Sequence, residues 1–237
     1  MIAPMSEVVR VDFSKPMPLF PLPDTVLLPH AVQPLHIFES RYQEMVNHCL
    51  DGAGQIAMAC FEGFKWKDHY HDSPPLRPVV CVGQIVQHES LSEGRHNILL
   101  HGVCRARIEE VVEPDDDHSY RMARLAPIEK IDEDPPSLDG VRENLRTMLK
   151  RPHLRRMRAA KHVTEWFDRE DVSTLALLEL IGSVLLYDSE LKYLLLAEPS
   201  PNRRADIIMS ELHHIDRVVG LADRQDSKSW PKGMSWN

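Results

Sequence analysis

The pattern of apolar and polar positions changes character a little past the middle of the chain. From about Lys15 to Lys130, apolar residues come in short runs, or alternate with polar residues, over lengths typical of strands. After about Ser137 the apolar residues recur every three or four positions, which indicates helices. The sequence therefore predicts a strand-rich part followed by a helical part.

The strand-rich part opens with a proline-punctuated run and continues with further strand-like segments. These segments are Gln55–Phe61, Val79–His88, Asn97–His101, Cys104–Glu110 and Tyr120–Leu125. One helix interrupts them from about Glu39 to Leu50, because four apolar residues there share a face: Tyr42, Met45, Val46 and Cys49. Short strands, tight turns and one helix predict a compact, curved, barrel-like sheet.

The apolar periodicity of the second part predicts several helices. Pro152 divides the first two, and the next, Leu175–Tyr187, is apolar nearly all round and is expected at the centre of a bundle. A short helix to Ala197 and a longer one from Pro201 follow. The predicted class is α+β. The expected divisions are 1–130 for the barrel domain, 131–222 for the helical bundle and 223–237 for a flexible tail, with a proline-containing linker at 131–137.

Charge and cysteine usage narrow the function classes. The formal net charge is -8, with a pI near 5.9, which disfavours non-specific binding of nucleic acid. The four cysteines form no Cys-x-x-Cys pair, so a structural zinc site or redox motif is not expected. The N-terminus has no signal-peptide pattern and Leu175–Tyr187 is too short to span a bilayer, so we expect a cytoplasmic protein without a membrane partner.

Catalytic motifs are missing from the sequence. There is no P-loop, no Gly-x-Ser-x-Gly elbow, no His-Glu-x-x-His helix and no Gly-x-Gly-x-x-Gly. His69 and His71 could share one face of a strand, but no third ligand stands at a suitable spacing, and a solvated loop is the favoured interpretation. We expect no metal, no cofactor and no catalytic residue.

One segment is strongly basic in this acidic chain. Residues 142–161 hold eight Arg or Lys residues and one Glu. The candidate patch for an anionic partner is Arg151, Arg155 and Arg158. The favoured alternative is a solvated helix face, because these residues interleave with apolar ones as in any amphipathic helix.

The opening run from Pro18 to Tyr42 carries more large apolar residues than a peripheral segment needs. Most of them are expected in the core. Some could line an exposed groove that holds an extended apolar peptide.

Two motifs in this part of the chain carry a family resemblance. The first is the run from Pro18 to Pro29 followed by Pro34-Leu-His-Ile-Phe-Glu-Ser-Arg-Tyr42. The second is Val82-Gly-Gln-Ile-Val86 followed by the strand that contains Gly102-Val-Cys-Arg-Ala-Arg107. In order and spacing, these motifs resemble the amino-terminal substrate-binding domain of Lon proteases.

The resemblance implies a PUA-like pseudo-barrel followed by a helical bundle, and a domain that binds unfolded or damaged proteins. Full Lon proteases add an ATPase module and a Ser-Lys protease module. The sequence holds no P-loop, and the pair Ser227-Lys228 lacks the protease context, so we expect neither module here. We therefore expect a stand-alone, ATP-independent and non-enzymatic chain. The expected peptide-binding residues are Leu28, His36, Phe38, Arg41 and Tyr42.

Three functions remain open from the sequence. The favoured one is a polypeptide-binding module, an adaptor in proteolysis or quality control whose partners are unfolded polypeptide and a protease or chaperone; a weak homo-oligomer also stays open. The second is binding of RNA or another anionic partner through the barrel and the basic helix 142–161, which the net charge disfavours. The third is an unrecognised hydrolase.

Overall fold

The structure is a computed structural model that describes residues 9–63, 65–67, 70, 73–128 and 137–224. Its contacts group the chain into two compact units. The first unit comprises Met1–Pro135 with Leu186–Ser200, and the second comprises Pro136–Leu185 with Pro201–Asn237. Each unit is described by itself below.

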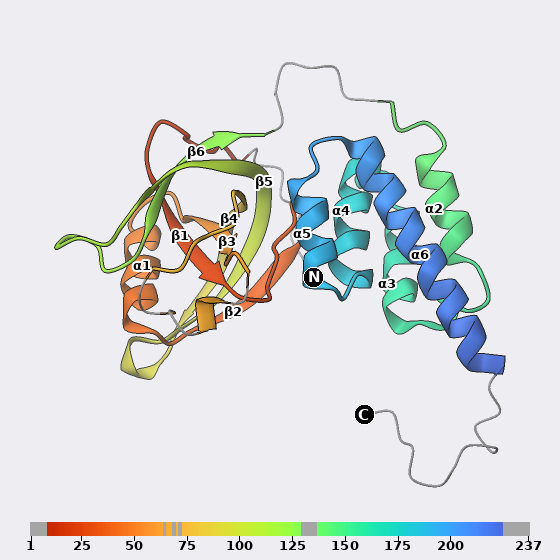
Figure 1. The fold of residues 1–237 in the computed structure, drawn as a ribbon, viewed down its shortest axis with the longest axis horizontal. Coiled ribbons are helices and arrows are strands. Elements are labelled where there is room, and N and C mark those ends of the chain that lie inside the picture. The colour runs from red at the N-terminus through yellow and green to blue at the C-terminus, as the bar shows by residue number, and fades with distance from the viewer. Residues whose placement is uncertain (1–8, 64, 68–69, 71–72, 129–136, 225–237) are drawn as a thin grey trace, which may run out of the picture. The chain divides into compact units, whose positions relative to one another are not determined.

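The first unit is built on six strands (Figure 1). They are β1 Met17–Leu22, β2 Val32–Ile37, β3 Gln55–Cys60, β4 Val79–Ser90, β5 His96–Val112 and β6 Met122–Pro127. The sheet order is β2-β5-β4-β3-β1-β6, and β6 also pairs with β5. This second pairing closes β5, β4, β3, β1 and β6 into a ring, and leaves β2 outside it as an edge strand on β5.

Alanine and valine make up most of the buried cluster inside this ring. The buried cluster is Met17, Leu19, Ala57, Ala59, Val80, Val82, Ala106, Ala123 and Leu125. Small side chains suit a tightly curved sheet because its interior is narrow. At Gly102 a Cβ atom would lie 2.2 Å from the carbonyl oxygen of Leu28, so only glycine allows β5 to pass that close to the opening run.

Helix α1, Ser40–Leu50, belongs to the same unit and buries the predicted face of Tyr42, Met45, Val46 and Cys49. Two short 3₁₀ segments complete the unit's loops, η1 at Lys65–Lys67 and η2 at Ser92–Gly94. The hairpin between β4 and β5 turns at η2, where Gly94 has a φ of 71°.

Helix α5, Ser189–Ala197, packs against the sheet although the sequence placed it with the helical bundle. The backbone N–H of Val79 donates to the Tyr193 hydroxyl at 3.0 Å. The buried Arg105 of β5 donates through Nε to the carbonyl of Leu196 at 3.1 Å and through Nη2 to that of Leu195 at 3.4 Å. These bonds satisfy the last carbonyls of α5, which an isolated helix end leaves unpaired.

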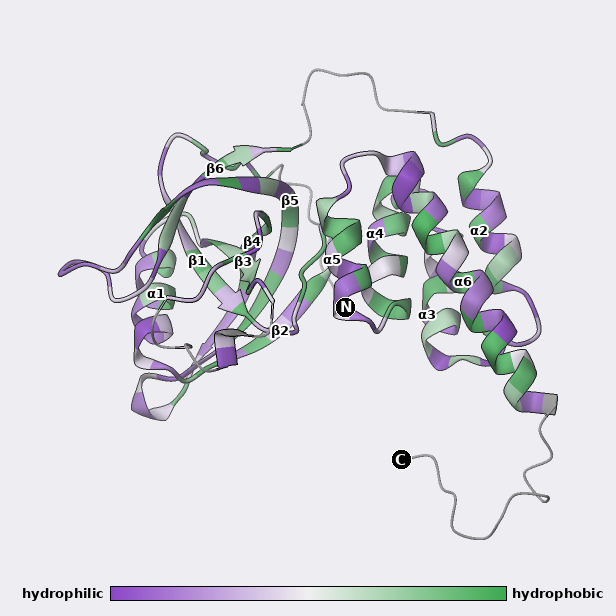
Figure 2. Cartoon of the chain, in the orientation of Figure 1, coloured by the Kyte–Doolittle hydropathy of each residue, from purple (hydrophilic) through white to green (hydrophobic). Residues whose placement is uncertain are grey.

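The second unit is a bundle of α2 Val141–Leu149, α3 Arg158–Trp166, α4 Thr174–Leu185 and α6 Pro201–Arg224, with the 3₁₀ segment η3 at Leu154–Arg156. Helix α4 is apolar over most of its surface, as Figure 2 shows, and it packs against α2, α3 and α6. This confirms the central place expected for Leu175–Tyr187, although α4 ends at Leu185.

The α+β class, with a barrel-like sheet followed by helices, is confirmed. The predicted break at Pro152 is present, because Pro152 and the η3 turn separate α2 from α3, so the basic segment 142–161 is not one continuous helix. The predicted linker at 131–137 lies outside the described residues except for Ser137, and so does the predicted tail beyond Arg224, the last residue of α6. The expected domain boundaries stay a prediction.

Candidate functional site

An apolar groove opens in the first unit between the end of β1 and the edge strand β2. Its volume is about 330 Å³. Its main lining residues come from β1, from β2 and the residues after it, from α1 and from the loop after β3: Phe20, Leu22, Leu35, Phe38, Tyr42 and Tyr70. We call it the apolar groove.

The floor of the apolar groove is held rigidly and its rim is exposed. Phe20 and Tyr42 are almost fully buried, and their rings meet edge to face with centroids 4.7 Å apart. Phe38 follows β2 directly and is 63% exposed. An apolar floor with a protruding aromatic ring is suited to holding an apolar side chain of a ligand.

A polar cluster fixes Tyr70 beside the start of α1. The Tyr70 hydroxyl donates to Oε1 of Glu39 at 2.6 Å, and Arg41 Nη2 lies 2.9 Å from Oε2 of the same carboxylate. The guanidinium of Arg41 also lies over the rings of Tyr42 and Tyr70, at 4.6 and 4.8 Å from their centroids. These contacts position Tyr70 as one wall of the groove.

The two phenols that line the apolar groove, Tyr42 and Tyr70, are held in their neutral form. Burial raises the pKa of Tyr42, and burial together with the hydrogen bond to Glu39 raises the pKa of Tyr70, so both phenols are neutral at pH 7. Burial also raises the pKa of Cys49 to about 12 and that of Cys60 to about 11. Neutral phenols and protonated thiols are poor nucleophiles.

A second hollow, of about 310 Å³, lies over the strands β2, β5 and β4. Three side chains line up across these strands, because His36 pairs with Asn97 and Asn97 with Glu89. His36 Nδ1 donates to Oδ1 of Asn97 at 2.8 Å, and Asn97 Nδ2 donates to Oε2 of Glu89 at 2.9 Å. Because Oδ1 of Asn97 accepts the hydrogen carried by Nδ1 of His36, the other ring nitrogen of a neutral imidazole, Nε2, carries no hydrogen and can accept a hydrogen bond.

The structure brings most of the expected peptide-binding residues together. His36, Phe38 and Tyr42 all line the apolar groove, and Arg41 supports its wall. Leu28 does not take part, because its side chain is 0% exposed. It belongs to the core beneath the opening run and offers no surface to a ligand in this structure.

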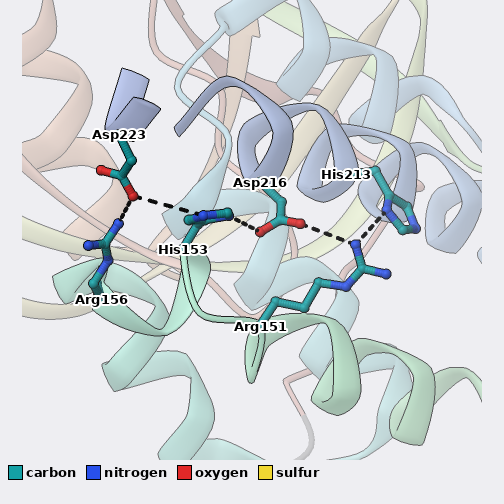
Figure 3. Close-up of polar contacts among 6 residues, drawn as sticks. All are labelled: Arg151, His153, Arg156, His213, Asp216 and Asp223. Atoms are coloured by element: carbon teal, nitrogen blue, oxygen red, sulfur yellow. Dashed lines mark hydrogen bonds and ion pairs between the residues drawn. The ribbon is translucent and has the colours of Figure 1, made fainter. Parts of the chain in front are cut away.

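Several basic side chains of the predicted patch in the second unit pair with carboxylates of the same unit. Figure 3 shows Arg151 and His153 on either side of Asp216, with nitrogen–oxygen distances of 3.1 Å to each. Arg156 pairs with Asp223, also on α6. The cations of the η3 region thus meet carboxylates of α6, in keeping with the solvated, internally paired interpretation.

Two further arginines of the basic segment form hydrogen bonds with backbone carbonyl groups of this chain. Arg142 and Arg146 each donate to the carbonyl of Phe167 at 2.9 Å, at the end of α3. A hollow of about 480 Å³ remains, lined by Lys150, Arg155 and Lys161 among others. No ion pair joins these three cations to another side chain in the described part of the chain. Arg158, exposed at the start of α3, is not among its lining residues.

Sequence reasoning missed one residue of the groove, Tyr70, and the partner of Arg105, which holds α5 to the sheet. Tyr70 stands in a polar, proline-flanked loop with no apolar pattern, and its place beside Glu39 depends on tertiary structure. Arg105 is the first arginine of the Gly102-Val-Cys-Arg-Ala-Arg107 motif, but the sequence did not indicate that its partner lies on α5.

No three His, Cys, Asp or Glu side chains of the described residues are grouped so that they could hold a metal ion. His69 and His71 lie outside the described residues. Among the helices that the structure describes, none is both long and apolar enough to cross a membrane. All four cysteines are free, and three of them are buried: Cys49, Cys60 and Cys81.

Comparison with solved structures shows the same fold in two Lon fragments. The N-terminal domain of Mycobacterium avium complex Lon protease matches with a TM-score of 0.61 and 16% identity, covering 84% of this chain and 98% of that one. The Lon N-terminal domain protein from Xanthomonas campestris matches with a TM-score of 0.60 and 21% identity, covering 83% and 98%.

Curated relatives are full Lon proteases. Lon protease from Helicobacter pylori strain J99 is 24% identical over 203 residues, which is 85% of this chain and 20% of the relative. Lon protease from Trichlorobacter lovleyi is 31% identical over 109 residues, or 46% of this chain and 13% of the relative. The chain thus spans about a fifth, or less, of the length of these two relatives.

The family model described as the ATP-dependent protease La (LON) substrate-binding domain matches residues 16–214. The match takes in all six strands, the helices α1 to α5 and most of α6. This chain therefore belongs to the LON substrate-binding domain family.

Proposed function

We propose that this chain is a non-catalytic module that binds unfolded or partly folded polypeptide in the apolar groove. One observation carries the proposal: Phe38 is 63% exposed over a groove whose floor contains Phe20 and Tyr42. Burying a large apolar side chain contributes about 1.5 to 3 kcal/mol, and a ligand side chain inserted beside Phe38 would gain burial for both partners.

The family description supports the class of ligand, because it names a substrate-binding domain. The relatives are named as proteases, and the chain covers only a minor share of their length. We propose that it presents polypeptide to a protease or chaperone as an adaptor and needs no ATP for binding. The neutral phenols and the Glu39–Arg41 ion pair at the groove support binding without catalysis.

Fluorescence anisotropy with a labelled, permanently unfolded model protein tests the proposal. We expect binding with a Kd on the order of 10 µM and a loss of about tenfold for Phe38→Ser. The matched control is Val218→Ser, which removes an apolar side chain that is 47% exposed on α6 of the other unit and should leave the Kd unchanged. Absence of binding, or equal affinities for both variants, would refute the proposal.

A second candidate is binding of an anionic partner in the hollow lined by Lys150, Arg155 and Lys161. The observation that favours it is that these three cations form no ion pair in the described part of the chain, although Glu165 and Asp168 line the same hollow. Here Arg155→Ser with Lys161→Ser should abolish a gel shift of structured RNA, whereas Arg151→Ser should not, since Arg151 is paired with Asp216. If RNA does not bind at physiological salt, this candidate is excluded for RNA.

A further inference from the structure

The edge strand β2 pairs with β5 along one side only. Within the described residues no strand pairs with its other side, which we call the free edge. The apolar groove lies beside this edge, since residues of β2 and of β1 line it together. An edge of unpaired backbone next to an apolar groove is a template for a further strand.

The hydrogen-bond pattern identifies which backbone groups face the free edge. Gly102 N donates to the carbonyl of Ala31 at 2.8 Å, just before β2 begins. Antiparallel pairs alternate between bonded and non-bonded positions, so Gln33, Leu35 and Ile37 are the residues bonded to β5. The backbone groups that face away from β5 are therefore those of Val32, Pro34 and His36.

Pro34 supports the same parity independently. A proline has no N–H to give to a neighbouring strand, so it is tolerated where that N–H would face away from the ladder. The free edge thus offers the N–H of Val32, the N–H of His36 and the carbonyls of all three residues. None of these N–H groups has a hydrogen-bond partner in the described part of the chain, while the carbonyl of Pro34 accepts a bond from its neighbour Gln33 at 3.2 Å.

The side chains of β2 differ on its two faces. Val32, Pro34 and His36 are exposed on the outer face, where His36 also lines the apolar groove, whereas Leu35 and Ile37 line the groove and are less exposed. A strand beside β2 would present alternate side chains to these two faces. One set would enter the apolar groove, and the other would lie beside the Pro34 ring and the imidazole of His36.

We propose that an extended polypeptide segment adds to the free edge of β2 as a further strand. Its apolar side chains occupy the apolar groove, and its intervening side chains are hydrogen-bond donors that face Nε2 of His36. This inference rests on the proposed function and deepens it, since it states the conformation and the side-chain pattern of the bound polypeptide. Strand addition supplies affinity through backbone bonds that any sequence can make.

Pro34 also argues for a foreign segment rather than a second copy of this chain. If two β2 edges paired with each other, each would meet the missing N–H of the other's proline, and the ladder would lose donors on both strands. A foreign strand without proline at that position supplies every donor that the carbonyls of β2 require.

The first test compares His36→Pro with His36→Ala. Both variants remove the imidazole, but only the proline removes the N–H on the free edge, and pairing with β5 is untouched because position 36 does not bond to it. The probe is a peptide of alternating leucine and threonine with a lysine at each end. We expect His36→Pro to bind about tenfold more weakly than His36→Ala, with the Tm of both variants as the check on folding.

The second test uses the unchanged protein and N-methylated peptides, so it does not depend on folding of a variant. One peptide carries N-methyl groups on its leucines and the other on its threonines. In a paired strand only alternate amides face the neighbour. We therefore expect one methylated peptide to lose about tenfold in affinity and the other to bind like the parent.

The outcomes separate this inference from the proposed function. If the parent peptide binds, Phe38→Ser weakens it and both methylated peptides bind alike, the groove binds polypeptide but strand addition is refuted. If neither the parent peptide nor the unfolded protein binds, both proposals fall. If sedimentation shows a dimer that His36→Pro dissociates, a second copy occupies the free edge and the inference is again refuted.

Discussion

Among the residues that the structure describes, each of the two units buries one arginine, and the two arginines are held in different ways. Arg105 in β5 and Arg204 in α6 are both 1% exposed. Arg105 donates to the backbone carbonyls of Leu195 and Leu196 at the end of α5. Arg204 lies 3.0 Å through Nε from Oε1 of Glu179, a carboxylate of α4 that is only 2% exposed.

The difference shows two uses of one side chain. In the barrel unit the guanidinium meets the partial negative charge at a helix end, and so attaches α5 to the sheet. In the bundle unit a full positive charge meets a full negative charge between two helices. The attraction between the two ions offsets the hydration that each loses on burial. Removing one partner should therefore be more harmful in the bundle than in the barrel.

The largest effect is expected for Glu179→Gln. The substitution removes the negative charge of Glu179 from beside the buried Arg204, and breaking one half of a buried ion pair costs about 3 to 5 kcal/mol of unfolding free energy. Urea denaturation followed by circular dichroism measures this loss. The control is Asp206→Asn, which neutralises an exposed acid of α6 and should change stability by less than about 0.5 kcal/mol.

The double substitution Glu179→Leu with Arg204→Leu sharpens the same comparison. It removes both buried charges and replaces them with apolar side chains, so most of the lost stability should return. A double variant as unstable as Glu179→Gln would show that the ion pair is not the source of the effect.

A smaller loss, of about 2 kcal/mol, is expected for Arg105→Met, because it leaves helix-end carbonyls without their charged donor. The loss should be local, so hydrogen exchange should quicken in α5 more than in α6. Arg124→Met serves as the control, since Arg124 is exposed on the neighbouring strand β6, pairs with Glu110 and should leave α5 unchanged. Uniform quickening across the chain would contradict a specific link to α5.

Acid should weaken the barrel through its histidines. Burial, together with the neighbouring His88, holds the pKa of His96 below its ordinary value of 6.5. The unfolded chain then binds protons first, so the stabilisation is complete above pH 6.5 and is lost as the pH falls below it. The Tm should drop by a few degrees between pH 7.5 and 5.5, and by less in His96→Leu; an identical drop would exclude His96 as the cause.

The smallest effect is expected for Asp216→Asn in the bundle. Its partners Arg151 and His153 are about half and one third exposed, so solvent screens both pairs, and the loss should stay below about 1 kcal/mol. Thermal melts at low and high salt measure it. If the loss exceeds that of Arg105→Met, the surface network of Figure 3 matters more than the buried contacts.

The sequence predicted most of the secondary structure, and the reasons are local. The apolar face of α1 and the apolar run of α4 follow from periodicity alone. The place of α5 could not be predicted in this way, because a short helix with apolar residues suits a bundle or a sheet equally well. Its position depends on Arg105 and Tyr193, whose partners are distant in sequence.

The candidate site was predictable in part. The apolar surplus of the opening run indicated a groove, and Phe38 and Tyr42 line it. Tyr70 could not be found, since a tyrosine in a polar loop carries no periodic signal. The burial of Leu28 was equally hidden, because an apolar residue between prolines is suited to the core and to a groove alike.

By itself the sequence determined the α+β class, the family motifs and the apolar content of the opening run, because strand and helix periods and proline positions are local properties of the chain. Only the tertiary structure decided that β2 is an edge strand, that α5 packs with the sheet and that Arg151 faces a carboxylate of α6. These features depend on which distant residues meet, and burial and hydrogen bonding select those partners only once the whole chain has folded.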